Sequence, residues 1–208
     1  MFRNRVSRKV ELYLPALILG LLSGCHQPIT ISSQSDACQF LYDNPRINQA
    51  VLFYAPTPSR QALTLAVIKH ESNFKAKARP VKSWLIQDWI PWRYYSTARG
   101  YAQVTDPTWS DFSRAQGGLV SRYALIDHIH FVNWYFDRHE KQLRSGDDFY
   151  EYYFLFHDGP TGYHQKKYRR SRPLHRFALR VAADAKRYQS QLSDCQAVLR
   201  WHSNWQQF

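Results

Sequence analysis

Apolar residues recur along most of this 208-residue chain with the period of an α-helix. The longest run lies near the C-terminus, where seven positions share one helical face: Leu174, Phe177, Val181, Tyr188, Leu192, Cys195 and Leu199. Because strands alternate with period two, and few stretches here do, a sheet would not bury these residues together. The length suits one full core, and no internal repeat is visible. The sequence therefore predicts a mainly α fold in one domain.

Capping and helix-breaking residues divide the chain into separate helices. Thr57-Pro58 precedes a helix that ends at Ser72, and Asp106-Pro107 opens another that Gly117-Gly118 closes. Further helices are expected over residues 121–144 and over residues 149–157, the latter ended by Asp158-Gly159-Pro160. The segment 79–99 is the exception, because it gathers five large aromatic residues and two prolines. A short β-hairpin and an irregular loop both fit this aromatic insertion, which contains Trp84, Trp89, Trp92, Tyr94 and Tyr95.

The first 25 residues have the features of a targeting segment. Four basic residues precede an apolar run over residues 12–22, which is short for a membrane span, and Leu-Ser-Gly then leads to Cys25. The segment resembles a bacterial lipobox, which implies a signal peptide over residues 1–24, lipidation of Cys25 and a tether to residue 36. A domain over residues 37–208 would follow. Because His26 rather than Asp follows the cysteine, the resemblance implies an outer-membrane anchor facing the periplasm. A plain signal peptide or an N-terminal membrane anchor is the alternative.

The remaining two cysteines, Cys38 and Cys195, lie near opposite ends of the expected domain. In an oxidising cell envelope they predict a disulfide, with two free buried thiols as the alternative. The chain carries 28 Lys and Arg against 16 Asp and Glu, for a net charge of +12. In an envelope protein, a basic cluster such as that over residues 166–176 is either a solvated face or a contact for acidic peptidoglycan or anionic lipid. Nucleic acid is not an expected partner.

One carboxylate stands at the end of an apolar helical stripe. Leu63, Ala66, Val67, His70 and Glu71 fall at positions i, i+3, i+4, i+7 and i+8, so Glu71 lies where the buried face meets the helix end. Apolar surroundings remove hydration from a carboxylate and raise its pKa toward the value that a general acid needs near neutral pH. Alone, the pattern also fits a solvated or ion-paired glutamate.

Three blocks of sequence place this glutamate in a wider pattern. They are Leu65-Ala66-Val67-Ile68-Lys69-His70-Glu71-Ser72-Asn73-Phe74, then Gly100-Tyr101-Ala102-Gln103-Val104 with Pro107-Thr108, then Phe156-His157-Asp158-Gly159-Pro160. In content and order they resemble the soluble lytic transglycosylase-type domain of the lysozyme-like superfamily. The resemblance spans residues 58–165 and implies a lysozyme-like fold that needs no cofactor. A metal site is not expected either, since His128 and His130 would point about 200° apart on a helix.

The resemblance implies cleavage of the β-1,4 bond between N-acetylmuramic acid and N-acetylglucosamine in the glycan strands of peptidoglycan. Glu71 would protonate the leaving oxygen and then take the proton of the sugar's own C6 hydroxyl, which attacks C1. The product is a 1,6-anhydro sugar, and no water is consumed. Ser72, Tyr101, Gln103 and His157 fall on motif positions that imply contact with the substrate.

This sequence departs from the family pattern at several positions. The segment between Glu71 and Gln103 is longer, and Tyr101-Ala102 replaces the usual Leu-Met. Phe156 and His157 replace Tyr and Asn, which removes a hydroxyl, and Tyr152 and Tyr153 are the two candidates to replace it. The inserted aromatic residues fit either core packing or a surface on which sugar rings stack. Two alternatives therefore stand: a non-catalytic lipoprotein that binds peptidoglycan or an envelope-assembly partner, and a muramidase that uses water.

Overall fold

The computed structural model describes residues 29–30, 34–80, 96–144 and 148–205. Within these ranges the chain forms seven α-helices and two short 3-10 helices, and the only β-pairing is an isolated bridge between Arg99 and Val104. The helices are α1 (Ala37–Asp43), α2 (Pro45–Tyr54), α3 (Pro58–Ser72), α5 (Asp106–Ala115), α6 (Leu125–His139), η2 (Glu140–Gln142), α7 (Phe149–His164), η3 (Lys167–Arg170) and α8 (Arg172–Trp205). The predicted mainly α fold is confirmed.

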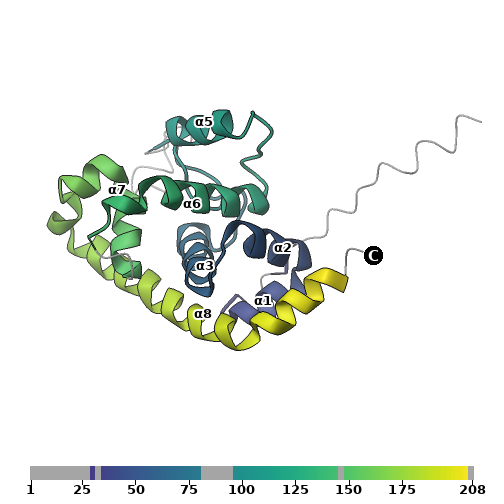
Figure 1. Cartoon of the computed structure of the whole chain (residues 1–208). Coiled ribbons are helices and arrows are strands. Elements are labelled where there is room, and N and C mark those ends of the chain that lie inside the picture. Colours follow the sequence, from purple (N-terminus) through teal and green to yellow (C-terminus); the bar gives the residue numbers. More distant parts are fainter. Residues whose placement is uncertain (1–28, 31–33, 81–95, 145–147, 206–208) are drawn as a thin grey trace, which may run out of the picture.

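Helix α3 is the central element, with α6 on one side and α8 on the other (Figure 1). Thr57 caps its first turn by accepting the Arg60 N–H at 3.2 Å, as the capping signal predicts. Eight consecutive residues, Gln61 to Ile68, are buried, so the helix is enclosed on all sides. Because the helix is packed on all sides, its C-terminal end has a fixed position where the buried core meets the surface.

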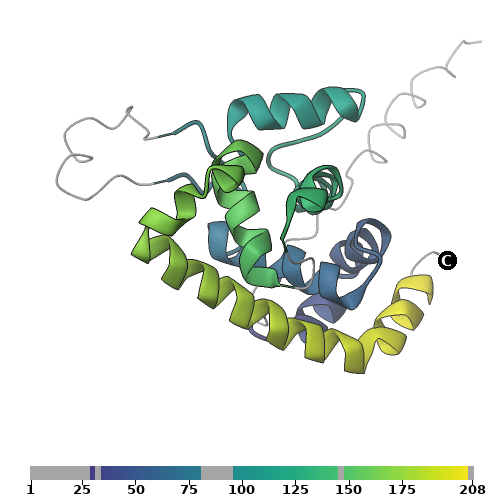
Figure 2. The same cartoon turned by 60° about the vertical axis from the view of Figure 1, so that its left-hand side comes forward.

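Helix α8 spans 34 residues, about 50 Å, along one edge of the molecule (Figure 2). It contacts α1, α2, α3 and α7, and the predicted stripe faces this core, with Phe177 and Cys195 partly buried and the other five members fully so. A disulfide between Cys38 and Cys195 joins α1 to α8, with the two Cα atoms 6.1 Å apart. The predicted pairing is thus present in the structure.

Three predicted helix boundaries are wrong. The helix predicted to reach residue 144 ends at His139, where the short 3-10 helix Glu140–Gln142 replaces its last turn. The helix predicted from residue 121 begins only at Leu125, because the Ser121 N–H donates to the Asp127 carboxylate at 2.8 Å and turns the chain. The helix predicted to end at residue 157 resumes after a kink at Gly159 (φ 71°, ψ 170°) and continues to His164. Pro160 suits the first turn of this second piece, since its missing N–H is unpaired there anyway.

Several predictions concern residues outside the described ranges. These are the signal peptide, the lipidation of Cys25, and the hairpin or loop formed by the aromatic insertion. Part of the expected tether is described, and there the Thr30 N–H donates to Asn44 Oδ1 at the start of α2, at 2.8 Å. Among the described helices, none combines the length and apolarity needed to cross a bilayer.

Candidate active site

Glu71 lies in the last turn of α3, and the backbone after it is held tightly. Asn73 adopts a left-handed conformation (φ 52°), and its N–H donates to the Lys69 carbonyl at 2.7 Å. Phe74 is also left-handed and buries its ring against Phe40 of α1, with 4.7 Å between the ring centroids. The helix end is fixed from both sides, so the position of the Glu71 carboxyl is set by the fold.

Tyr153 of α7 is the only described residue that hydrogen-bonds the Glu71 carboxyl. Its hydroxyl donates to Oε1 at 2.9 Å. The other oxygen, Oε2, accepts no hydrogen bond from the described residues, so it is the atom available to a bound molecule. Tyr153, one of the two tyrosines considered from sequence, thus contacts the carboxyl, whereas the Tyr152 hydroxyl donates to Glu140 at 3.3 Å.

Burial is the main influence on the protonation of Glu71. It raises the pKa from 4.5 to about 7, although the hydrogen bond from Tyr153 and the nearby charge of His157 act in the opposite direction. Both opposing effects stabilise the carboxylate form. Near neutral pH the group is therefore divided between acid and carboxylate, which suits a residue that must both give and take a proton.

Glu71 opens into a cleft of about 890 Å³. The cleft lies between the end of α3, the loop before α5, the faces of α6 and α7, and the start of α8. Its walls are partly aromatic and partly polar. The lining residues are His70, Glu71, Arg79, Pro80, Ser96, Ala98, Ala102, Gln103, Val104, Thr105, Thr108, Phe131, Tyr135, Tyr153, Phe156, His157, Asp158, Gly159, Ser171, Pro173, Leu174 and Phe177.

Asp158 is the only other carboxylate that lines the cleft among the described residues. Its Oδ1 lies 2.9 Å from Nδ1 of His157, a half-exposed side chain at the cleft wall. Its Oδ2 is buried without a hydrogen-bond partner in the described part of the chain. Asp158 is therefore engaged with the neighbouring imidazole at one oxygen and inaccessible at the other. Phe156, beside them, packs against the aromatic rings of α6.

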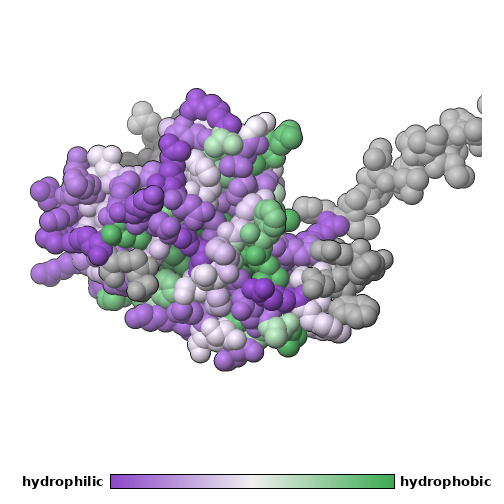
Figure 3. All heavy atoms as spheres, in the orientation of Figure 1, coloured by the Kyte–Doolittle hydropathy of each residue, from purple (hydrophilic) through white to green (hydrophobic). Residues whose placement is uncertain are grey.

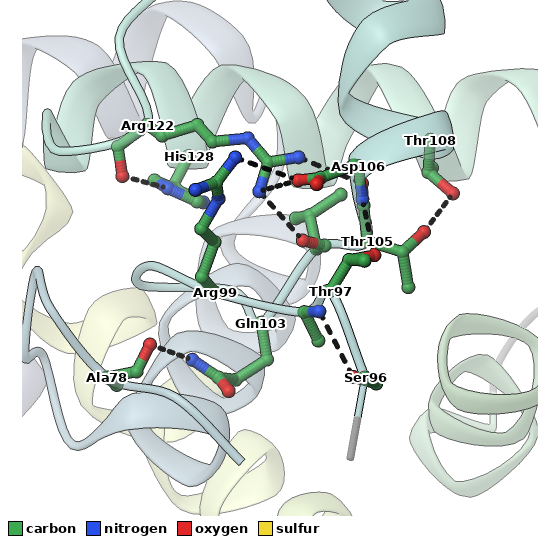
Figure 4. A network of polar contacts seen from close by, with 12 residues as sticks. Ala78, Ser96, Thr97, Arg99, Gln103, Thr105, Asp106, Thr108, Arg122 and His128 are labelled. Carbon is green, nitrogen blue, oxygen red and sulfur yellow. Dashed lines mark hydrogen bonds and ion pairs between the residues drawn. The ribbon is translucent and has the colours of Figure 1, made fainter. Parts of the chain in front are cut away.

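Gln103 faces the cleft from a tight loop closed by the bridge between Arg99 and Val104 (Figure 4). Its Nε2 donates to the carbonyl oxygens of Ala78 and Gly100, at 2.9 and 2.7 Å. Because both partners only accept, the amide orientation is fixed, and Oε1 points away from them. Gln103 has a positive φ of 47°, which is uncommon outside glycine and is held here by these bonds.

A buried histidine holds this loop from the opposite side. Nδ1 of His128 accepts the Ala102 N–H at 3.3 Å, so the proton of the neutral ring lies on Nε2, which donates to the Arg122 carbonyl at 2.9 Å (Figure 4). Burial lowers the pKa of His128 to about 4, and the Arg122 charge adds to this against the opposing hydrogen bond. Gly100 has φ 81°, and a Cβ there would lie 2.6 Å from Nε2. The loop therefore packs directly onto a neutral imidazole.

Asp106 joins the same loop to the elements that follow it. Its Oδ1 pairs with the guanidinium groups of Arg99 at 2.9 Å and Arg122 at 3.0 Å. These pairs are partly exposed, so each contributes little to stability by itself. Their geometry instead ties the start of the loop, at Arg99, and the segment before α6, at Arg122, to the start of α5.

Two of the predicted substrate residues lie away from the cleft surface. Ser72 is buried, and its hydroxyl donates to the Ile68 carbonyl one turn earlier in α3, at 3.1 Å. Tyr101 is also buried, with its ring edge toward His128 at 5.6 Å between centroids, and burial raises its pKa. Of the predicted set, the structure therefore brings Glu71, Gln103 and His157 together around one cleft.

Sequence reasoning missed one part of this site. His70, next to Glu71, lines the cleft, and its Nε2 lies 3.0 Å from Oδ2 of Asp184 on α8. Lys69 donates to the same carboxylate oxygen at 2.9 Å. No sequence signal links residues more than 110 positions apart, although His70 already stood on the predicted buried face. Among the described residues, no group of three or more His, Cys, Asp or Glu side chains could hold a metal ion.

The fold and site define a mainly helical domain in which, among the described residues, Glu71 is the accessible carboxylate of the cleft, at the end of a buried helix. The family model described as the transglycosylase SLT domain matches residues 13–195. The chain therefore belongs to this family, whose members are lytic transglycosylases, and the resemblance seen in the three sequence blocks is confirmed. No curated protein and no solved structure matches the chain.

Proposed function

We propose that this protein is a peptidoglycan lytic transglycosylase that cleaves the β-1,4 bond between N-acetylmuramic acid and N-acetylglucosamine, with Glu71 as its general acid and base. The observation that carries the proposal is the raised pKa, about 7, of a carboxyl that opens into a cleft of about 890 Å³. The family membership supports the same substrate class.

In this mechanism, protonated Glu71 gives its proton to the glycosidic oxygen while the bond to C1 breaks. The resulting carboxylate takes the proton of the C6 hydroxyl, and that oxygen forms the new bond to C1. The proton thus returns to Glu71, and a 1,6-anhydro sugar is released. Oε2 is the atom that performs both proton transfers, since Oε1 accepts the hydrogen bond from Tyr153. That hydrogen bond stabilises the carboxylate in the interval between the two transfers.

The cleft favours this reaction over hydrolysis by a pair of carboxylates. Glycosidases that use water generally need a second carboxylate as a nucleophile or as a base for the water. The second cleft carboxylate among the described residues, Asp158, is paired with His157 at one oxygen and buried at the other. The sugar's own hydroxyl, which needs only the one residue Glu71, is therefore the better nucleophile.

Product analysis tests the proposal. A chain of residues 26–208, which contains the whole described fold, is incubated with purified sacculi, and the released muropeptides are identified by mass spectrometry. Anhydro-ended products that disappear in Glu71→Gln support the proposal. Asp111→Asn, an exposed carboxylate paired only with Arg114, is the matched control and should keep full activity. Reducing ends would indicate a muramidase, and binding without turnover would indicate a non-catalytic protein.

We also propose that Cys25 is lipidated and anchors the domain in the outer membrane, facing the periplasm. This proposal rests on the sequence of the first 26 residues. Metabolic labelling with a fatty acid tests it, since label should enter the wild-type chain and be lost in Cys25→Ala. Labelling that survives this substitution would contradict it.

A further inference from the structure

One end of the molecule carries a concentration of positive charge that the proposed reaction does not use. Between residues 159 and 183 the sequence contains no Asp or Glu. Seven exposed cations lie in this stretch, and none of them forms an ion pair within the described residues: Lys166, Lys167, Arg169, Arg170, Arg172, Arg176 and Arg180. Figure 3 shows hydrophilic residues over the corresponding end, at the left of the view.

Three of these cations form a row on the first turns of α8. Arg172, Arg176 and Arg180 follow one another at intervals of four residues, about 6 Å apart along the helix axis. We call this row the arginine stripe. A single stripe of three unpaired guanidinium groups has a repulsive energy that an anionic partner would relieve.

The arginine stripe runs along the rim of the cleft. At 100° per residue, Pro173 and Phe177 lie about 40° apart on α8, and both line the cleft. Arg180 and Arg176 follow within about 60° of Pro173 on the side away from the buried Leu174. A molecule that fills the cleft against Pro173 and Phe177 therefore passes beside these guanidinium groups.

A direct contact connects the stripe to the cleft wall. The guanidinium carbon of Arg180 lies 5.1 Å from the centroid of the Phe177 ring, in a cation–π arrangement. Phe177 in turn contacts His70 and Tyr153, with centroids 5.5 and 5.3 Å away. Only two side chains, Phe177 and Tyr153, therefore separate Arg180 from the Glu71 carboxyl.

We propose that the arginine stripe binds the carboxylates of the peptides attached to the glycan strand that occupies the cleft. This inference rests on the proposed function, because it takes the strand as the occupant. A planar guanidinium suits a carboxylate through paired hydrogen bonds. The peptides branch from the same sugar whose bond is cleaved, so they leave the cleft at its rim.

Anionic lipid is the competing partner for such a surface, and the position of Thr30, near the start of the described residues, argues against it. Thr30, five residues after the predicted lipid site, is fixed to Asn44 between α1 and α2. These helices lie at the opposite end of the molecule from the start of α8 (Figure 1). A bilayer at the anchor is therefore not directed toward the stripe.

The test compares two substrates and two sets of substitutions in the chain of residues 26–208. Arg172→Gln, Arg176→Gln and Arg180→Gln are combined in the stripe variant. The control variant combines Arg46→Gln, Arg138→Gln and Arg200→Gln, which removes the same charge from exposed positions outside the cleft lining. The substrates are intact sacculi and glycan strands from which an amidase has removed the peptides. Thermal melting checks that both variants are folded.

The inference predicts that the stripe variant raises KM for intact sacculi about tenfold, from three exposed charge contacts, and leaves KM for peptide-free strands unchanged. Higher salt should abolish the difference. An equal loss on both substrates, no loss on either, or the same loss in the control variant would overturn it.

Two further measurements separate this inference from the proposed function. Sedimentation with sacculi in a Glu71→Gln background reports binding without turnover, so the stripe is tested even if no anhydro product forms in the wild type. Vesicles containing anionic lipid are the second probe. If the stripe variant loses vesicle binding but keeps sacculus binding, the surface is a lipid site and the inference is wrong.

Discussion

The raised pKa of Glu71 has a cost in stability, and Glu71→Gln should remove it. The folded state holds this proton up to about pH 7, whereas an unfolded chain releases it near 4.5. Between these values the folded state binds more protons, so stability falls as pH rises. Below about pH 4 the group is protonated in both states and contributes no penalty. Above about pH 7 the whole penalty is present.

The size of the penalty follows from the pKa difference. A rise from 4.5 to about 7 corresponds to about 3 kcal/mol, at about 1.4 kcal/mol per pKa unit. Because the carboxyl is partly exposed in the cleft, solvent screening reduces this to about 1–3 kcal/mol. Gln has nearly the same shape, stays neutral at every pH and still accepts from Tyr153. Relative to the wild type, Glu71→Gln should therefore raise the free energy of unfolding by about 1–3 kcal/mol more at pH 8 than at pH 4.

Chemical denaturation of the chain of residues 26–208, with its disulfide intact, measures this difference at the two pH values. Asp111→Asn is the control, since its carboxylate is exposed and paired only with Arg114 on the same helix. Its effect should be the same at both pH values to within a few tenths of a kcal/mol. A Glu71→Gln variant that is no more stabilising at pH 8 than at pH 4 would refute the reasoning.

Three further predictions concern the hydrogen bond to Glu71, the disulfide, and the loop at Gly100. Tyr153→Phe removes a hydrogen bond that favours the charged form, so the alkaline limb of the kcat/KM profile should move up by about 0.5–1 pH unit, and a downward move would contradict this. Replacing Cys38 and Cys195 by Ser opens a link across 157 positions and should cost about 2–5 kcal/mol in denaturant, whereas unchanged stability would mean that the bond is absent. Gly100→Ala should destabilise the fold by about 2–5 kcal/mol, because the new Cβ would lie 2.6 Å from a buried atom. Gly117→Ala, with open space around it, should cost only about 1–2 kcal/mol. Equal losses of stability in denaturant would contradict the clash.

Much of the fold could be predicted because its signals are local. The apolar stripe on α8 and the Thr57 cap of α3 depend on residues within a few turns of one another. Both appear as expected. The start of α6 was misjudged because the Asp127 side chain holds the preceding turn outside the helix. Such a side-chain bond competes with helix formation and leaves no trace in the apolar period.

In the candidate site, too, the features encoded within one helix could be predicted. Glu71 was identifiable because one helix carries both the stripe and the carboxylate. Tyr153 was one of two candidates, and only the rotation of α7 selects it over Tyr152. The pair of His70 with Asp184 joins α3 to α8 across most of the chain, and neither helix alone encodes it.

The central claim is that Glu71 remains protonated up to neutral pH, and a carboxyl titration measures this directly. Residues 26–208 contain three glutamates, Glu71, Glu140 and Glu151, so a chain labelled with 13C at glutamate Cδ gives three signals in an NMR titration. Glu71→Gln identifies the signal of interest by its loss. The account predicts that this signal titrates with a pKa near 7. A value near 4.5 would contradict it.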